Sequence, residues 1–336
     1  MIEVEFTPAD YRRIRFACSA VGEAVKSLRV LSAGRRSGLH GRWLSWVGTT
    51  DIAHQVDVAL LTTVVRPQGY LPDFLGPLPP GRSVGFAEGL AQVAATPIDV
   101  VRHELSHLAT HAVAQQGPNR DQRATLIEHL LGDPDRALRR IVEELERYWL
   151  LAIEPHWPRI HALLRADLAY RLEELGSGGA ERLFASLHPS VAFRGDLLTV
   201  VKYYQGRVQL RGRGLMLVPS AFPWPDVLIS TADPQPSLTY GSRGLGTLWE
   251  TGGSPPGTEA PLAAVLGTAR ANILALLELP MSTTQLATQL NATPPTVNAH
   301  LKALHRAGIV TSRRDGRVVL YRRTPLGDQL VTGRTD

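Results

Sequence analysis

The sequence of 336 residues lacks the features that mark secreted, disulfide-stabilised or membrane-spanning proteins. Its single cysteine, Cys18, cannot form a disulfide within the chain, which excludes a small disulfide-stabilised scaffold. The first residues carry no basic segment followed by an apolar one, so no signal peptide is expected. No uncharged apolar run reaches about 18 residues, the length that a membrane-spanning helix needs. We therefore expect a cytoplasmic protein without a membrane partner.

Disorder is also excluded, because 44% of the residues are hydrophobic and basic and acidic residues are nearly balanced. The length allows two domains. Glycine and proline are frequent, without a fixed period, over residues 251–261, which predicts a linker there. We expect an N-terminal domain over residues 1–250 and a second domain over residues 262–330.

Positive charge is concentrated at the C-terminal end. The whole chain carries a formal charge of +5. Residues 261–336 hold nine lysines and arginines against four acidic residues, so they account for the whole excess, and residues 1–260 are neutral. A local basic excess is typical of a domain that binds a polyanion, although a solvated basic surface would have the same composition.

The N-terminal region reads as mostly helical, with strands towards its end. Residues 8–31 have helical periodicity, with Ile14, Val21, Val25 and Leu28 on one stripe. A capping pattern at residues 96–99 opens a further helix that is expected to run to about residue 116. The remaining expected elements are helices at 121–131, 135–153 and 155–175, and strands at 197–204, 207–210, 215–219 and 227–230. This pattern predicts an α+β N-terminal domain.

The C-terminal region predicts three helices. Residues 262–277 follow a three-to-four spacing of apolar residues. Ser282 can cap a short helix at 283–290, and Thr293 can cap the next one, which has Pro294 at its first position and extends over 294–307. A three-residue turn joins the last two helices, which is the arrangement of a helix-turn-helix. The overall fold class is therefore mainly α with some β, ending in a winged helix-turn-helix.

The last of these helices has one apolar and one polar face. Val297, Leu301 and Leu304 are expected to face the core. Small and polar residues near the start of the other face suit the major groove of double-stranded DNA, because they allow close approach and reach base edges or phosphates. The expected contacts of the two helices with DNA are Thr284, Gln285, Thr293, Pro295, Thr296, Asn298, Ala299 and Lys302.

A basic hairpin follows. Residues 310–314 and 317–321 flank Asp315 and Gly316, a pair typical of a tight two-residue turn. Arginines on both arms, with Arg313, Arg314 and Arg317 as the expected contacts, give this hairpin the character of a wing that touches phosphates or the minor groove.

These segments resemble the winged-helix domain of ArsR-type bacterial transcriptional regulators. The resemblance is carried by residues 266–270 (LGTAR), 286–290 (LATQL), 296–304 (TVNAHLKAL), 307–310 (AGIV) and 314–321 (RDGRVVLY). Residues 15–28, 155–157 and 214–222 resemble the partner domain of a long, actinobacterial-type branch of that family. The resemblance implies a regulator. Metal-sensing members carry cysteines near the first of the two short helices, but residues 278–290 contain none, so we expect no thiolate metal site there.

One motif suggests an enzyme. His103, Glu104 and His107 spell H-E-x-x-H, and His111 lies one helical turn further on, which is the spacing of zinc ligands in metalloproteases. The extended motif that would supply a third ligand is missing, because residue 110 is Thr and residue 113 is Val. We therefore favour an amphipathic helix whose histidines lie at its solvent margin or form hydrogen bonds within the protein.

The sequence therefore predicts a DNA-binding transcriptional regulator that is not an enzyme and needs no cofactor. We expect it to act as a homodimer, because paired half-sites are how such domains gain affinity. The N-terminal region is expected to dimerise the protein, to respond to a small-molecule effector, or both. A zinc-dependent hydrolase using His103, Glu104 and His107 is the main alternative, and a protein-interaction module whose basic C-terminal region contacts an acidic partner is a further one.

Overall fold

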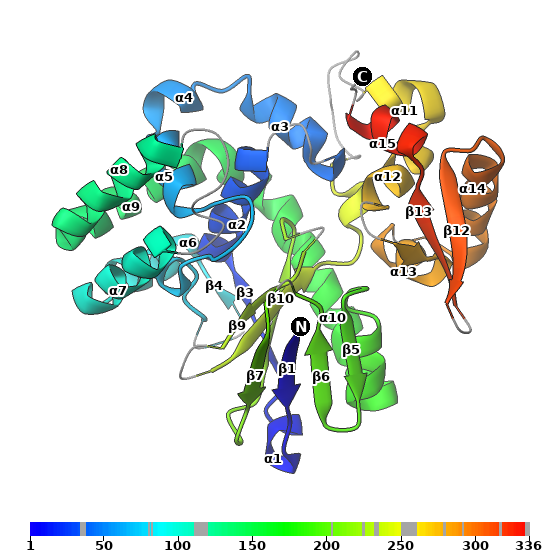
Figure 1. Cartoon of the computed structure of the whole chain (residues 1–336), viewed down its shortest axis with the longest axis horizontal. Helices are drawn as coiled ribbons and strands as arrows, with labels where there is room; N and C mark the ends of the chain where they lie inside the picture. Colours follow the sequence, from blue (N-terminus) through cyan, green and yellow to red (C-terminus); the bar gives the residue numbers. More distant parts are fainter. Residues whose placement is uncertain are drawn as a thin grey trace. The chain divides into compact units, whose positions relative to one another are not determined.

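The computed structural model describes residues 1–33, 38–79, 81, 83–110, 120–202, 204–223, 226–231, 235–249, 261–277, 280–290, 292–315 and 318–332. The fold is mainly α-helical with short strands, as predicted (Figure 1). The chain forms two compact units. The first, called the mixed unit, comprises Met1–Phe16, Arg35–Trp43 and Arg159–Asp336, and the second, called the helical unit, comprises Ala17–Gly34 and Leu44–Pro158.

The helical unit is built around α2 (Ala20–Ala33), which is buried from Ala20 to Val30. Helices α5, α6 and α9 pack against it. The stripe of Val21, Val25 and Leu28 is at most 1% exposed, as the periodicity predicts. The other helices of this unit are α4 (Ile52–Gln55), α5 (Val58–Val64), α6 (Phe86–Ala94), α7 (Ile98–Thr110), α8 (Arg120–Gly132) and α9 (Pro134–Tyr148), with a short parallel pair of β3 (Cys18–Ser19) and β4 (Ser83–Val84).

The single helix predicted at residues 8–31 is wrong. A short α1 (Pro8–Tyr11) is followed by a turn, and β2 (Arg15–Phe16) pairs in parallel with Met216 and Leu217. Ile14 lies outside any helix and packs against the core of the mixed unit. Strand pairing with residues about 200 positions away overrides the local helical periodicity here.

Two other helix predictions are refined. Helix α9 is followed by a π-helical turn (Trp149–Ile153) and a 3₁₀ turn (Glu154–His156), and α10 extends over Trp157–Ala185, with a break at Gly179. The predicted end of the helix that starts at Ile98 lies outside the described residues.

Two four-stranded sheets form the core of the mixed unit. In the first, of order β5-β6-β1-β7, β1 (Ile2–Glu5) runs antiparallel to β6 (Leu197–Val200) and parallel to β7 (Gly206–Gln209), and β5 (Val191–Arg194) pairs with β6. In the second, of order β2-β8-β10-β9, β8 (Met216–Ser220) is parallel to β10 (Ser237–Gly241), which pairs with β9 (Leu228–Ser230). Leu183 and Phe184 of α10 belong to the same apolar core.

The C-terminal part of the mixed unit contains α11 (Pro261–Leu266), α12 (Thr268–Leu276), α13 (Thr283–Gln289), α14 (Pro294–Arg306) and α15 (Pro325–Thr332). A three-stranded sheet of order β11-β13-β12 joins Met281–Ser282, Val318–Arg323 and Val310–Asp315. The helix predicted over 262–277 is in fact divided, because Gly267 has a φ of 80° and ends α11.

The predicted linker at residues 251–261 lies outside the described residues apart from the first residue of α11. Throughout the described part of the chain, the structure contains no helix of the length and apolarity needed to cross a membrane.

Candidate nucleic-acid interface

The first helix of the C-terminal helix pair, α13, begins with a reciprocal cap. The backbone N–H of Gln285 donates to Ser282 Oγ at 3.2 Å, and the backbone N–H of Ser282 donates to Gln285 Oε1 at 2.8 Å. This capping box satisfies two N–H groups that the helix itself leaves without partners. Leu286 and Ala287 are buried, so the helix is also held from within.

The second helix, α14, is capped by Thr293 and has Pro294 in its first turn. The hydroxyl oxygens of Thr293 and Thr296 lie 2.8 Å apart, and the backbone N–H of Thr296 donates to Thr293 Oγ1 at 3.5 Å. Val297, Leu301 and Leu304 are at most 1% exposed, as predicted for the inward face. The cap and the buried stripe fix which face of α14 points outward.

The outward face of α14 carries most of the residues predicted to contact DNA. Thr293, Pro295, Thr296, Ala299 and Lys302 are exposed, and Asn298 is half-buried at the margin. Arg306 lies one turn beyond Lys302 and donates from Nε to the Lys302 carbonyl at 3.3 Å. The face is therefore small and polar at its N-terminal end and basic further along.

On α13 the two predicted contacts differ. Thr284 is exposed. Gln285 is half-buried, and its side-chain oxygen is engaged in the cap. Gln285 therefore has a structural task that the sequence pattern alone did not reveal.

The predicted basic hairpin forms, with β12 and β13 antiparallel and Arg313 opposite Leu320. Its predicted turn is wrong by one residue, because Asp315 belongs to β12 and pairs with Val318. Arg313, Arg314 and Arg322 are exposed. Gly316 and Arg317 lie outside the described residues. Arg323 is different, because it donates to Asp328 of α15 at 2.7 Å and to the carbonyl of Leu274 at 3.1 Å, and so anchors the hairpin to its neighbours.

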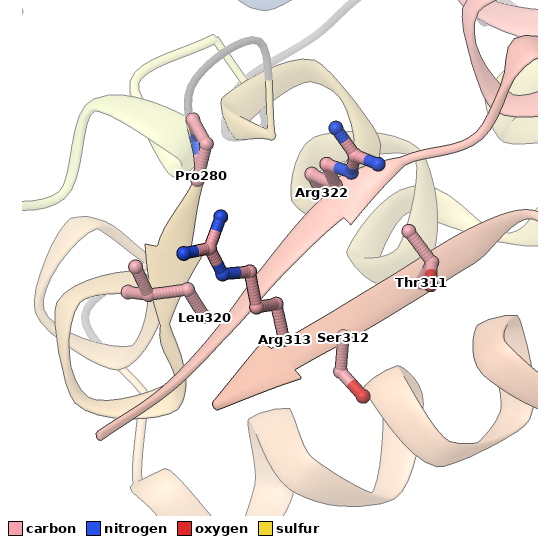
Figure 2. A pocket seen from close by; sticks show the side chains of 6 residues that line it. All are labelled: Pro280, Thr311, Ser312, Arg313, Leu320 and Arg322. Carbon is pink, nitrogen blue, oxygen red and sulfur yellow. The ribbon is translucent and has the colours of Figure 1, made fainter. Parts of the chain in front are cut away.

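The two faces of the hairpin differ in what they present. Thr311, Arg313, Leu320 and Arg322 line a pocket of about 260 Å³ together with Ser312 and Pro280, and the Arg313 guanidinium projects towards Pro280 (Figure 2). Because side chains alternate along a strand, Val310 and Arg314 lie on the face opposite to Thr311 and Arg313. Val310 is buried, and β12 packs against α14. Arg314 therefore shares the α14 side of the hairpin.

The short strand β11 (Met281–Ser282) was not predicted from the sequence. Met281 and Ser282 pair with Tyr321 and Leu320, which joins the residue that caps α13 directly to the hairpin. The strand is two residues long and its partner lies about 40 positions away, so no local periodicity could indicate it.

This arrangement of two capped helices and a hairpin is matched by a family model. Residues 269–312 match the bacterial regulatory protein arsR family. The C-terminal module is an ArsR-family winged helix-turn-helix domain. Residues 86–243 match a second model, a family of unknown function called DUF5937, which runs across both compact units. No curated protein and no solved structure matches the chain.

The ArsR-family domain makes the protein a DNA-binding transcription regulator. This domain contains no cysteine whose thiolate could bind a metal, since Cys18 is the chain's single cysteine. Cys18 is itself buried, in β3 of the helical unit.

The residues of the H-E-x-x-H motif point in different directions. His103 and His107 are exposed on α7, and the ring of Tyr70 packs edge-on against His107 at 4.5 Å. Glu104 faces the interior, where it accepts a hydrogen bond from the backbone N–H of Phe74 at 3.2 Å. His111 lies outside the described residues. In the part of the chain that is described, no group of three or more His, Cys, Asp or Glu residues could hold a metal ion.

Proposed function

We propose that this protein is a cytoplasmic, dimeric, sequence-specific regulator that places α14 in the major groove of DNA. The outward face of α14 carries the proposal, because it combines a small, polar N-terminal end with Lys302 and Arg306 further along. Recognition helices contact base edges with their N-terminal residues, where close approach needs small side chains. Lysine and arginine one turn later lie within reach of phosphates.

The hairpin supplies the second contact of this proposal. Arg313 and Arg314 are exposed on β12, with Arg314 on the side that packs against α14, and we assign both to phosphates together with Arg317. Contacts with phosphates give affinity that falls as salt rises, because binding releases counterions from the DNA. Thr284 of α13 is assigned to the phosphate backbone, while Thr293, Pro295, Thr296, Asn298 and Ala299 line the floor of the groove.

Residues 262–330 form the DNA-binding domain in this proposal, and residues 1–250 serve dimerisation and the response to a small effector. Two copies on one DNA face read two half-sites about one helical turn apart, roughly 34 Å. The DNA site would then be two-fold symmetric.

Selection of genomic fragments by the purified full chain, at physiological salt, tests this function. An enriched two-fold-symmetric motif, bound by a species of twice the monomer mass in analytical ultracentrifugation, is the expected result. Enrichment of an asymmetric motif by a monomer would refute the dimeric arrangement. Absence of any enriched sequence, over a range of salt concentrations, would refute sequence-specific recognition by α14.

A further inference from the structure

Arg66 is a buried arginine whose charge has no compensation within the described structure. It follows α5 in the helical unit and is 5% exposed. Its Nε and Nη1 atoms are buried, and neither has a hydrogen-bond partner among the described residues. A guanidinium group buried in this state is strongly destabilising, because it has lost its water without gaining a partner.

The neighbouring charge that acts on Arg66 is also positive. Helix α8, which carries Arg123, packs against α5. Burial lowers the pKa of Arg66, and repulsion from the Arg123 guanidinium lowers this pKa further. Two arginines brought together in a partly buried place form a typical site for an anion, because each planar guanidinium can donate two parallel hydrogen bonds to one oxyanion.

The segment that carries Arg66 is held in place by a different arginine. Arg29 of α2 donates from Nε to the Pro67 carbonyl at 3.2 Å and from Nη1 to the Gly69 carbonyl at 3.4 Å. Arg29 is therefore a structural arginine with backbone acceptors. Arg66 lies one position before Pro67 and is held by the same loop, but its Nε and Nη1 atoms donate no hydrogen bond to a backbone carbonyl. These donors are therefore pre-positioned for a group that comes from outside the chain.

We propose that Arg66 and Arg123 bind the oxyanion of a small molecule, a carboxylate or a phosphate group, within the helical unit. We infer that this is where the effector of the proposed regulator binds. The role of the site therefore rests on the proposed function. The binding step itself requires only the helical unit, and neither α14 nor the hairpin takes part in it.

Thermal unfolding of the full chain without DNA tests the site. The probes are inorganic phosphate and succinate, titrated against chloride at matched ionic strength, so that phosphate and carboxylate ligands are distinguished. We expect at least one of them to raise Tm in a saturable way, because a ligand that binds only the folded state stabilises it. Arg66→Met is expected to abolish this rise and to raise Tm in chloride alone, since an apolar chain of similar length removes the buried charge.

Arg139→Met is the matched control. Arg139 is an exposed arginine of α9 in the same unit, so its loss removes the same charge and should leave the anion-dependent rise unchanged. Arg66→Lys keeps the charge without the planar fork, and we expect about tenfold more anion for half-saturation. This variant also decides the matter if Arg66→Met does not fold.

A rise of equal size in the wild type and in Arg66→Met would overturn the proposal, because it would reflect a general salt effect on stability. So would the absence of a rise with either anion, or an unchanged half-saturation in Arg66→Lys. Because no DNA is present, a failure of the regulator proposal would leave these outcomes unaffected.

Discussion

Asp10 accepts a hydrogen bond from the backbone N–H of Gly214 at 2.8 Å, although the two residues are 204 positions apart. The other carboxylate oxygen of Asp10 accepts from the backbone N–H and the hydroxyl of Thr7, at 2.7 and 2.6 Å. Gly214 has a φ of 74°, and a Cβ at this position would lie 2.2 Å from the carbonyl oxygen of Arg13. This buried carboxylate therefore ties the first segment of the chain to the loop before β8.

The Asp10 contact predicts a pH-dependent stability. Burial alone would raise the pKa of Asp10, but hydrogen bonds from Thr7, Gly214 and Gly212 outweigh burial and lower this pKa below its usual value of 3.8. A lowered pKa in the folded state means that the contribution to stability is present above pH 3.8 and is lost as the pH falls through the folded value. Asp10→Asn should reduce the free energy of unfolding at neutral pH by about 1–3 kcal/mol.

Urea unfolding between pH 3 and pH 7 measures this effect. The difference between Asp10→Asn and the wild type should shrink at the acid end. Asp135→Asn is the control, because Asp135 is an exposed residue in an ion pair with Arg139, and such pairs contribute about 0–1 kcal/mol. A constant difference over the whole pH range would show that the charge of Asp10 is not what stabilises the fold.

The parts of the fold that could be predicted from sequence are those whose signals are local. Ser282 and Thr293 cap the helices at the predicted positions, and Val297, Leu301 and Leu304 form the predicted inward stripe. Caps and periodicity act within four residues, so a single sequence contains them in full.

The parts that were missed depend on distant partners. Arg15 and Phe16 lie within a stretch of helical periodicity, but strand pairing with Met216 and Leu217 determines their conformation. The pairing of β11 with β13 joins residues about 40 positions apart. The burial of Arg66 likewise had no signal in the sequence, because nothing in a local pattern distinguishes a buried arginine from a solvated one.

Two residues at the start of α13 are predicted to affect different properties, Ser282 the stability of the fold and Thr284 the binding of DNA. Ser282→Ala removes the side-chain acceptor for the Gln285 N–H and should lower the free energy of unfolding by about 1 kcal/mol. Thr284→Ala alters an exposed residue of the same helix, so it should leave stability within about 0.5 kcal/mol of the wild type while weakening DNA binding. Chemical unfolding and a DNA titration on both variants test this pair. If Thr284→Ala binds DNA as tightly as the wild type, Thr284 is not part of the interface.

Glu104 offers a test of the enzyme alternative. Burial raises the pKa of Glu104 above its usual value of 4.5, and Asp73 adds to this rise, while the hydrogen bond from Phe74 opposes it. The ionised form is thus disfavoured in the folded state, and stability should decline as the pH rises from 4.5 through the folded pKa. Gln keeps an acceptor for Phe74 without the charge, so Glu104→Gln should be more stable than the wild type at pH 7, with no advantage below about pH 4.

Thermal unfolding at the two pH values, together with metal analysis of the purified protein, provides the measurement. A catalytic zinc site would instead bind stoichiometric zinc, which His103→Ala would remove. In that case Glu104→Gln would abolish hydrolysis, because the ionised carboxylate would be the general base.

The two faces of the hairpin predict different roles for its arginines. Arg314 lies on the α14 side, whereas Arg322 lines the pocket on the other side of the hairpin (Figure 2). If α14 lies in the major groove, phosphates approach the side that Arg314 shares with Lys302. Lys302→Ala and Arg314→Ala should each weaken binding and flatten the slope of log affinity against log salt by about 0.9, the value for one lost phosphate contact. Arg322→Ala removes an equal charge from the same strand pair and should leave that slope nearly unchanged.

Fluorescence anisotropy over a range of salt concentrations distinguishes the three variants. A slope reduced equally by Arg314→Ala and Arg322→Ala would mean that the DNA contacts both faces of the hairpin.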